Sequence, residues 1–212
     1  MPDLATALRA VLPAGVGVGW ADPLAEATGL MAGEALPGAV PKRLAAFAAG
    51  RRAARAAMQG LGLTQVAVPM AADRAPIWPA GLVGSISHSE SHCVAVVSGG
   101  FGGLGIDLEP ASELPADLWD TILCADEPVT SGLMAKAAFC AKEAAYKAQF
   151  AVSGTLFGFD TLRMALAGNR FSATFRRDVA PFVQGYQING HLIFAEGQIA
   201  ALCWLPQVLK IP

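Results

Sequence analysis

Two acidic residues stand two positions apart at the end of an apolar, glycine-rich run. The segment GIDLEP places Asp107 and Glu109 directly after HCVAVVSGGFGGL. Alternate side chains of a strand point to opposite faces, so we expect Ile106 and Leu108 to face the core and both carboxylates to project together toward solvent. Such like charges repel unless water, a cation or a basic group separates them. An all-oxygen pair of this kind fits magnesium, which is held by one or two carboxylates plus phosphate oxygens and water.

A segment rich in alanine and lysine carries a second set of charges. AFCAKEAAYKA, residues 138–148, contains Glu143 and Lys147 at the spacing of a helical ion pair. Lys142 lies beside Glu143, about 100° further round a helix. The segment can therefore offer a carboxylate to a metal ion and ammonium groups to phosphates, although a solvated helix face would show the same pattern.

A histidine flanked by hydroxyl residues forms the third candidate. In GSISHS, Ser87 and His88 stand at the end of a strand pattern, where they could donate hydrogen bonds to an anion. The alternative is a histidine in an ordinary polar loop. His88, Glu90 and His92 also alternate like one strand face, but a transition-metal site would need further ligands.

The charge balance limits the classes of partner. The 212 residues include 15 Lys and Arg against 17 Asp and Glu, and the net charge of −2 argues against a nucleic-acid partner. Residues 35–74 hold six cations and one acid, whereas residues 75–135 hold eight acids and no Lys or Arg. Chance clustering on solvated faces could give this distribution. A negatively charged ligand, joined to the acidic part by a metal ion, would also explain it.

Hydropathy and cysteine usage favour a cytoplasmic protein. No apolar run reaches the roughly 18 to 20 residues that span a membrane, and MPDLATALRAVLPAG lacks the features of a secretory signal. The cysteines are scattered without a C-x-x-C pattern, which is typical of small buried side chains in a reducing compartment. They are Cys93, Cys124, Cys140 and Cys203.

Two long helices are expected to position these groups. The first runs from Pro41 to about Leu61, with proline in its first turn and glycines behind it. The second begins after Ser131, a suitable N-cap, and extends through the KEAAYK segment. A shorter helix is expected over Leu118–Leu123. The apolar stripe of the second helix is predicted to hold Leu133, Ala137, Cys140, Ala144 and Ala148.

Strand patterns surround these helices. They are GVGVGW (15–20), TQVAVPM (64–70), LVGSISHSESHCVAVV (82–97), GLGIDLE (103–109) and four segments between 161 and 205. Turns are predicted at Gly168-Asn169 and Asn189-Gly190. The chain thus runs strand, helix and strands twice, which predicts an α+β fold of two similar halves. We place them at residues 1–105 and 106–212 of one compact unit, each with a small, mostly antiparallel sheet and a long helix.

The motifs GSISHS, GIDLE and FCAKEAAYK, in this order, resemble those of the 4′-phosphopantetheinyl transferases. The chain is most similar to the compact bacterial branch associated with siderophore, nonribosomal-peptide and polyketide synthesis. KRLAAFAAGRRAARAAM and DRAPIWPAG match further motifs of that branch, and the resemblance covers about residues 15 to 175. It implies a pseudo-twofold pair of halves. It also implies transfer of the phosphopantetheine arm of coenzyme A to a serine of an apo carrier protein, releasing adenosine 3′,5′-bisphosphate.

The resemblance also implies roles for individual residues. Asp107, Glu109 and Glu143 match the magnesium-binding acids of the family, and Lys142 and Lys147 match its helix lysines, with Lys147 facing the pyrophosphate. The residues that match coenzyme A contacts are Arg43 and Arg51, Arg74 with its neighbour Asp73, and Ser87 with His88 in the nucleotide-phosphate motif. Phe157 matches a position along the pantetheine path.

Two departures from the family pattern stand out. Phe139 stands where many relatives have a tryptophan. The loop before Pro76 reads MAADR, whereas the same loop of other family members often has more lysine or glycine, and this difference leaves the roles of Asp73 and Arg74 open.

The implied chemistry needs charge neutralisation more than covalent help. Glu143, directly or through water, is the candidate base, and Lys147 adds positive charge as the bond breaks. We expect a monomer that selects its carrier through surface contacts, with residues 110–132 as one candidate region. Two other functions use the same groups: a magnesium-dependent phosphohydrolase, and a non-catalytic module that binds coenzyme A or a nucleotide.

Overall fold

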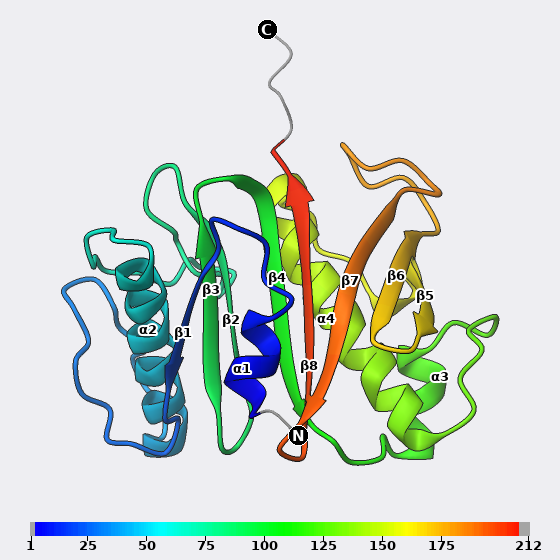
Figure 1. Ribbon diagram of the computed structural model, residues 1–212, viewed down its shortest axis with the longest axis horizontal. Helices are drawn as coiled ribbons and strands as arrows, with labels where there is room; N and C mark the ends of the chain where they lie inside the picture. Colours follow the sequence, from blue (N-terminus) through cyan, green and yellow to red (C-terminus); the bar gives the residue numbers. More distant parts are fainter. Residues whose placement is uncertain (1–2, 208–212) are drawn as a thin grey trace, which may run out of the picture. The chain divides into compact units, whose positions relative to one another are not determined.

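The computed structural model describes residues 3–207, which divide into two compact units (Figure 1). One unit comprises residues 13–101, and the other comprises residues 102–207 together with the described residues before Pro13. The division therefore lies four residues before the predicted boundary between residues 105 and 106, and the start of the chain belongs with the second unit. A short helix, α1 (Leu4–Arg9), brings it there, because Leu4 and Leu8 are buried and the Leu4 N–H donates to Glu196 Oε2 at 3.1 Å.

The unit of residues 13–101 is a three-stranded antiparallel sheet with one long helix. The strands follow the order β1-β3-β2, with β1 at Gly17–Ala21, β2 at Val83–His88 and β3 at Cys93–Ser98. The predicted helix is α2 (Pro41–Gly60), whose alanines pack on the sheet. A side chain at Gly17 or Gly19 would collide with the α2 backbone, so these glycines allow the close approach of strand and helix.

The unit of residues 102–207 contains a five-stranded sheet in the order β4-β8-β7-β6-β5. Its strands are β4 (Phe101–Pro110), β5 (Leu162–Ala167), β6 (Arg170–Phe175), β7 (Gln187–Ala195) and β8 (Gln198–Pro206), so that the first residue of β4 still belongs to the other unit. The long helix α4 (Gly132–Ser153) packs on this sheet. Three short helical segments complete the unit: η1 (Ala116–Leu118), α3 (Trp119–Ile122) and η2 (Phe159–Thr161).

Both ends of α4 follow local rules. Ser131 is the N-cap, as predicted, and its hydroxyl accepts a hydrogen bond from the Met134 N–H at 3.3 Å. The helix ends at Gly154, which adopts the left-handed conformation (φ 61°) that glycine allows. The predicted apolar stripe is buried except for Leu133, which is 40% exposed. The stripe prediction is wrong there because Leu133 lies one turn before Ala137, the first α4 residue of the core cluster that the helix shares with the sheet.

One predicted strand and one predicted turn are wrong. Residues 64–69 form no strand, because side chains rather than a neighbouring strand use their backbone groups: the Val68 N–H donates to Glu34, and the Val68 carbonyl accepts from Arg51. Gly190 lies inside β7, where a side chain would collide with the Phe171 ring. The turn between β7 and β8 is instead at Glu196-Gly197, both with positive φ.

No helix in the described residues is long and apolar enough to cross a membrane. The α+β architecture is as predicted, with two antiparallel sheets that each pack against a long helix.

Candidate functional site

Two glycines of β4 bring the acidic residues of that strand against α4. A side chain at Gly103 would collide with the Ala148 carbonyl, and one at Gly105 would collide with the Ala144 carbonyl. The helix backbone therefore lies directly on this face of β4. Asp107 and Glu109 follow on the same face because side chains alternate along a strand. They consequently lie against the earlier turns of α4.

Asp107 is buried, contrary to the prediction that it faces solvent. The residue is 4% exposed because α4 covers its face of the strand. Its Oδ1 lies 2.6 Å from Lys147 Nζ, and Lys147 also donates to the Ile106 carbonyl at 3.1 Å. Burial lowers the pKa of Lys147, but Asp107, with Glu143 and Cys140, raises it by more, so the net shift of this pKa is upward. Lys147 is therefore a firmly protonated cation at the acidic site.

Glu109 forms an ion pair with a second lysine, Lys136. Lys136 Nζ lies 3.2 Å from Glu109 Oε2, and the same ammonium lies 5.6 Å from the centre of the Phe139 ring. Burial raises the pKa of Glu109, as does Asp107. Lys136 was not predicted to belong to the site. The helical spacing of Lys136 with Glu143 and Lys147 (seven and eleven residues) would have placed all three on one side of α4.

Glu143 completes the group of acids from the opposite element. Burial raises the pKa of Glu143, Lys147 lowers it, and both Asp107 and Glu109 raise it. These effects mean that the three carboxylates lie within electrostatic range of one another. We use the name acid cluster for Asp107, Glu109 and Glu143 with the two lysines, Lys136 and Lys147.

The chemistry of the acid cluster fits a hard divalent cation. Carboxylate oxygens suit magnesium, which keeps several water ligands and takes others from phosphates, so it does not require a complete protein cage. Within residues 3–207, no three His, Cys, Asp or Glu side chains form a ready-made group for a metal ion. Lysine ammonium groups instead lie against Asp107 and Glu109. A cation at the cluster would have to displace or share with these ammonium groups.

Within residues 3–207, the segment of His88, Glu90 and His92 does not form a group that could hold a metal ion either. Glu90 pairs with Lys42 at 3.3 Å, and His92 Nδ1 shares a hydrogen bond with Ser91 Oγ at 2.7 Å.

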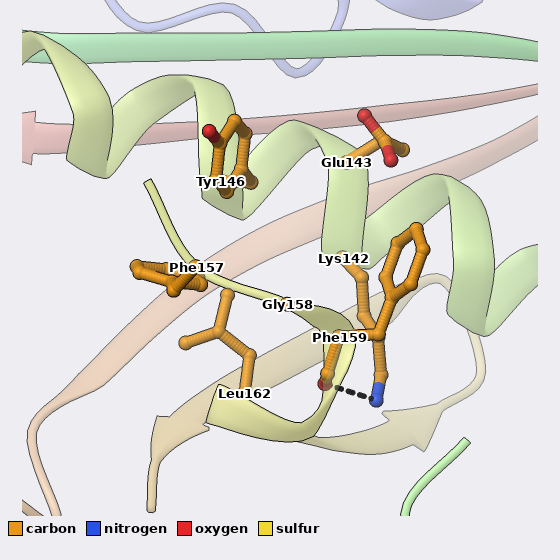
Figure 2. Close-up of a pocket in the computed structure, with 7 residues that line it drawn as sticks. All are labelled: Lys142, Glu143, Tyr146, Phe157, Gly158, Phe159 and Leu162. Atoms are coloured by element: carbon orange, nitrogen blue, oxygen red, sulfur yellow. Dashed lines mark hydrogen bonds between the residues drawn. The ribbon is translucent and has the colours of Figure 1, made fainter. Parts of the chain in front are cut away.

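A pocket with a volume of about 110 Å³ lies beside Glu143 (Figure 2). One wall comes from α4 and the other from the segment that leads into β5. The lining residues are Lys142, Glu143, Tyr146, Phe157, Gly158, Phe159 and Leu162. The rings of Tyr146 and Phe157 meet edge to face with centroids 5.2 Å apart. The structure thus brings Phe157 and Glu143 to one pocket, while Tyr146 was missed although it follows Glu143 by one helical turn.

Lys142 lies outside the acid cluster. Its side chain is 1% exposed, and its Nζ lies 2.8 Å from Glu127 Oε1 and 3.0 Å from the Phe159 carbonyl oxygen. The contact with coenzyme A phosphates that the resemblance implies stays a prediction. Glu127 was not predicted, because its fifteen-residue separation from Lys142 leaves no local signal.

The basic helix α2 holds its arginines in two different settings. Arg43 is exposed in the first turn, where the N-cap Val40 makes no side-chain capping bond and no acidic residue is present. Arg51 is buried: its Nε donates to the Val68 carbonyl at 3.0 Å, and its guanidinium lies 3.9 Å from the centre of the Phe47 ring. Burial lowers the pKa of Arg51, and Glu34 raises it in part. Arg51 therefore packs within its unit, and its role toward phosphates stays a prediction.

The other predicted coenzyme A residues lie in the same unit as α2. Ser87 is buried in β2 and His88 is exposed at the end of that strand. In the DRAP loop, Asp73 Oδ1 accepts from the Ala75 N–H at 3.0 Å, and Arg74 is exposed with φ 73°. Asp73 therefore shapes the turn that presents Arg74.

Comparisons with known proteins agree with the motif resemblance. Residues 32–98 match the family model described as the 4′-phosphopantetheinyl transferase N-terminal domain, and residues 103–203 match that of the 4′-phosphopantetheinyl transferase superfamily. The chain is 34% identical to the transferase Svp of Streptomyces mobaraensis over 175 residues, which cover 77% of this chain and 70% of Svp.

Other relatives align over shorter stretches. Identity to the transferase Npt of Nocardia iowensis is 36% over 129 residues, which cover 57% of this chain and 58% of Npt. Identity to enterobactin synthase component D of Salmonella typhi is 38% over 131 residues, 58% of this chain and 55% of that protein. The chain thus spans little more than half the length of these two relatives. With both family models matched and more than two thirds of Svp covered, this chain belongs to the 4′-phosphopantetheinyl transferase superfamily.

Proposed function

We propose that this protein transfers the 4′-phosphopantetheine arm of coenzyme A to a serine hydroxyl of an apo carrier protein. The observation that carries the proposal is the acid cluster, in which three carboxylates and two lysines from β4 and α4 meet beside an aromatic pocket. Because one relative is an enterobactin synthase component, we propose a carrier of siderophore, nonribosomal-peptide or polyketide synthesis. That the protein acts as a cytoplasmic monomer stays a prediction.

Asp107, Glu109 and Glu143 would hold magnesium in this proposal. When bound, the ion supplies positive charge to the diphosphate of coenzyme A and stabilises the phosphate that leaves. Lys147 adds a second positive charge, since Asp107 keeps it protonated and fixes its ammonium beside the carboxylates. Glu143 accepts the proton of the carrier serine, directly or through water. Burial raises the pKa of Glu143 in the metal-free protein, and ligation of magnesium would lower it again.

The pocket beside Glu143 suits the arm that is transferred. Phe157, Tyr146 and Leu162 give it an apolar lining, which matches the aliphatic part of pantetheine. Binding there would bring the arm close to the proposed base.

The phosphates of coenzyme A are assigned to the unit of residues 13–101. The first turn of α2 presents backbone N–H groups and the exposed Arg43 without an acidic neighbour in that turn, an arrangement that favours a phosphate. We assign Arg51, Arg74, Ser87 and His88 to the same ligand.

Replacing Arg43 by alanine is expected to raise the KM for coenzyme A about tenfold with little change in kcat. A phosphate contact remote from the reacting atoms stabilises ground state and transition state alike. Steady-state kinetics at varied coenzyme A measures both constants. Lys42→Ala is the matched control, because that neighbouring ammonium pairs with Glu90 at the surface. An unchanged KM in Arg43→Ala would remove α2 from the binding site.

Incubation with coenzyme A and a panel of apo carriers, with magnesium or with a chelator, tests the proposed function. Intact-protein mass spectrometry should show a carrier heavier by one phosphopantetheine arm, only when magnesium is present. Release of phosphate without carrier modification would indicate a phosphohydrolase instead. Magnesium-independent binding of coenzyme A without turnover would indicate a binding module.

A further inference from the structure

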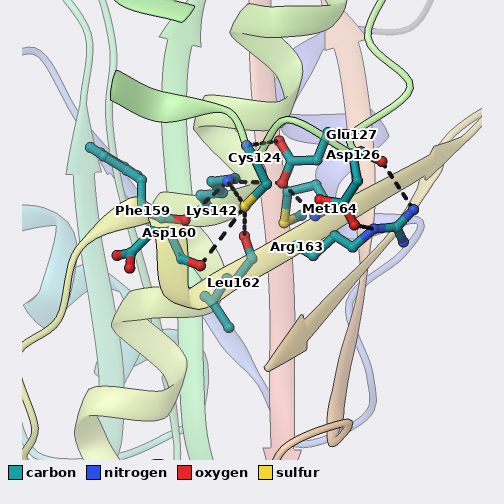
Figure 3. A network of polar contacts seen from close by, with 9 residues as sticks. All are labelled: Cys124, Asp126, Glu127, Lys142, Phe159, Asp160, Leu162, Arg163 and Met164. Atoms are coloured by element: carbon teal, nitrogen blue, oxygen red, sulfur yellow. Dashed lines mark hydrogen bonds and ion pairs between the residues drawn. The ribbon is translucent and has the colours of Figure 1, made fainter. Parts of the chain in front are cut away.

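The most deeply buried ion pair of the described residues lies directly beside the candidate base. Glu127 and Lys142 have side chains that are 0% and 1% exposed, with Oε1 and Nζ 2.8 Å apart (Figure 3). Burying two charges costs so much hydration free energy that such a pair adds little net stability. Its position next to Glu143 therefore calls for another explanation.

The Glu127 carboxylate joins three parts of its unit. Oε1 accepts the Met164 N–H of β5 at 2.7 Å, and Oε2 accepts the Cys124 N–H at 3.2 Å, while Lys142 provides the contact with α4. Hydrogen bonds to a charged acceptor are stronger than neutral ones, and here they lie in a low-dielectric interior. Glu127 therefore fastens α4 to the first residues of β5.

Lys142 extends this connection to the pocket. Its Nζ donates to the Phe159 carbonyl oxygen at 3.0 Å, the dashed contact in Figure 2, and lies 3.6 Å from Cys124 Sγ. Phe159 and Gly158 form the pocket wall that faces Glu143 and Tyr146. One ammonium group thus connects α4, which carries Glu143, to the opposite wall.

We infer that Glu127, acting through Lys142, is a positioning residue that sets the width of the pocket between α4 and the segment 157–162. This inference rests on the proposed function, because it gives the pocket the phosphopantetheine arm as occupant. Glu127 itself touches neither coenzyme A nor the metal ion. Without the pair, the wall would shift relative to Glu143 and the arm would lose its fixed path.

The test compares two ligands that differ only by the pantetheine part of the arm and carry the same phosphates. Glu127→Gln keeps the shape of the side chain but removes its charge, and the double variant Glu127→Gln/Lys142→Met also removes the buried cation that Glu127→Gln would leave uncompensated. Isothermal titration with magnesium present should show coenzyme A bound at least about fivefold more weakly by both variants. Adenosine 3′-phosphate 5′-diphosphate keeps all the phosphates of coenzyme A and lacks only pantetheine. Its affinity for each variant should lie within about a factor of two of its affinity for the unaltered protein, equivalent to about 0.4 kcal/mol.

The structure provides a matched control in the same two segments. Asp126 Oδ2 pairs with Arg163 Nε at 2.7 Å, one residue before Glu127 and one before Met164, but this pair is exposed. Asp126→Asn should leave both affinities unchanged. Near-ultraviolet circular dichroism shows whether each variant keeps its packing. If Glu127→Gln does not fold, the two ligand affinities are measured on the double variant Glu127→Gln/Lys142→Met.

Two outcomes would overturn the inference. Wild-type affinity for coenzyme A in a folded variant would mean that the pair does not set the pocket. An equal loss for both ligands would mean that Lys142 contacts phosphates instead. The inference is tested by ligand affinity, whereas the proposed function is tested by carrier modification. A protein that binds coenzyme A but modifies no carrier would therefore refute the proposed function, and the affinity comparison would still decide the inference.

Discussion

Replacing Asp107 by asparagine is expected to lower the rate of carrier modification by about 10³-fold at saturating coenzyme A and magnesium. Asparagine keeps the size of the side chain but removes its charge. The change deletes a proposed metal ligand and also the carboxylate that holds Lys147 Nζ at 2.6 Å and raises the pKa of that lysine. Two sources of positive charge at the diphosphate are weakened by one substitution. Quenched single-turnover reactions, followed by carrier mass, measure this rate.

The same variant should also lose stability. Asp107 is buried against α4, and its loss leaves a partly buried lysine without its anionic partner. We expect the free energy of unfolding to fall by about 2 kcal/mol, as measured by urea denaturation. Asp126→Asn, which removes an exposed carboxylate of the same unit, should leave the free energy of unfolding unchanged. A folded Asp107→Asn protein with near-normal turnover would remove Asp107 from the catalytic group.

Short-range signals made much of the fold predictable. Helix α4 has a serine N-cap, many alanines and a terminating glycine within one segment. The pairing of Asp107 with Glu109 on one strand face follows from alternation alone. These features depend only on residues that lie within about one helical turn or two strand positions in the chain. A single sequence is therefore enough to predict them.

Features set by distant partners were not predictable in the same way. The opposite face of β4 was expected to be in water, but Gly105 admits α4, and its close approach buries Asp107. The sequence shows the glycine but not the helix that will lie on it. Gly190 illustrates the same ambiguity, since there glycine makes room for the Phe171 ring and not for a turn.

The ion pairs of the site show this limit most clearly. A lysine beside a glutamate on a helix gives no indication that one of them is buried. Lys142 forms an ion pair with Glu127, fifteen residues earlier in the chain, and Lys136 forms one with Glu109 of β4. Helical spacing separates Lys142 from Lys136 and Lys147, but only the packing of α4 shows which acidic partner each lysine has.

The two units use the same packing device for different purposes. Glycines at alternate positions of β1 receive the backbone of α2, as those of β4 receive α4. The helix of the first unit carries arginines, whereas the strand of the second continues into Asp107 and Glu109. A glycine-lined strand thus lets each helix approach closely, while the charged residues come from the helix in the first unit and from the strand as well as the helix in the second.

Replacing Glu143 by glutamine is expected to lower kcat about 10²- to 10⁴-fold while coenzyme A still binds. The amide cannot accept the serine proton, yet it keeps the shape of the pocket wall that Glu143 shares with Tyr146 and Phe157. Isothermal titration with coenzyme A and carrier mass spectrometry provide the two measurements. Asp178→Asn, at an exposed carboxylate of the same unit outside residues 110–132, is the control and should keep normal turnover.

A metal titration of Glu143→Gln separates the two roles proposed for this carboxylate. If Glu143 only holds magnesium, raising the magnesium concentration refills the weakened site and restores turnover. If it is the base, the deficit persists at saturation, because Asp107 and Glu109 can still retain the ion but Lys147 keeps Asp107 engaged and Lys136 keeps Glu109 engaged. Neither remaining acid is then placed to take the proton. Recovery of near-normal kcat at saturating magnesium would therefore exclude Glu143 as the base and leave it as a metal ligand.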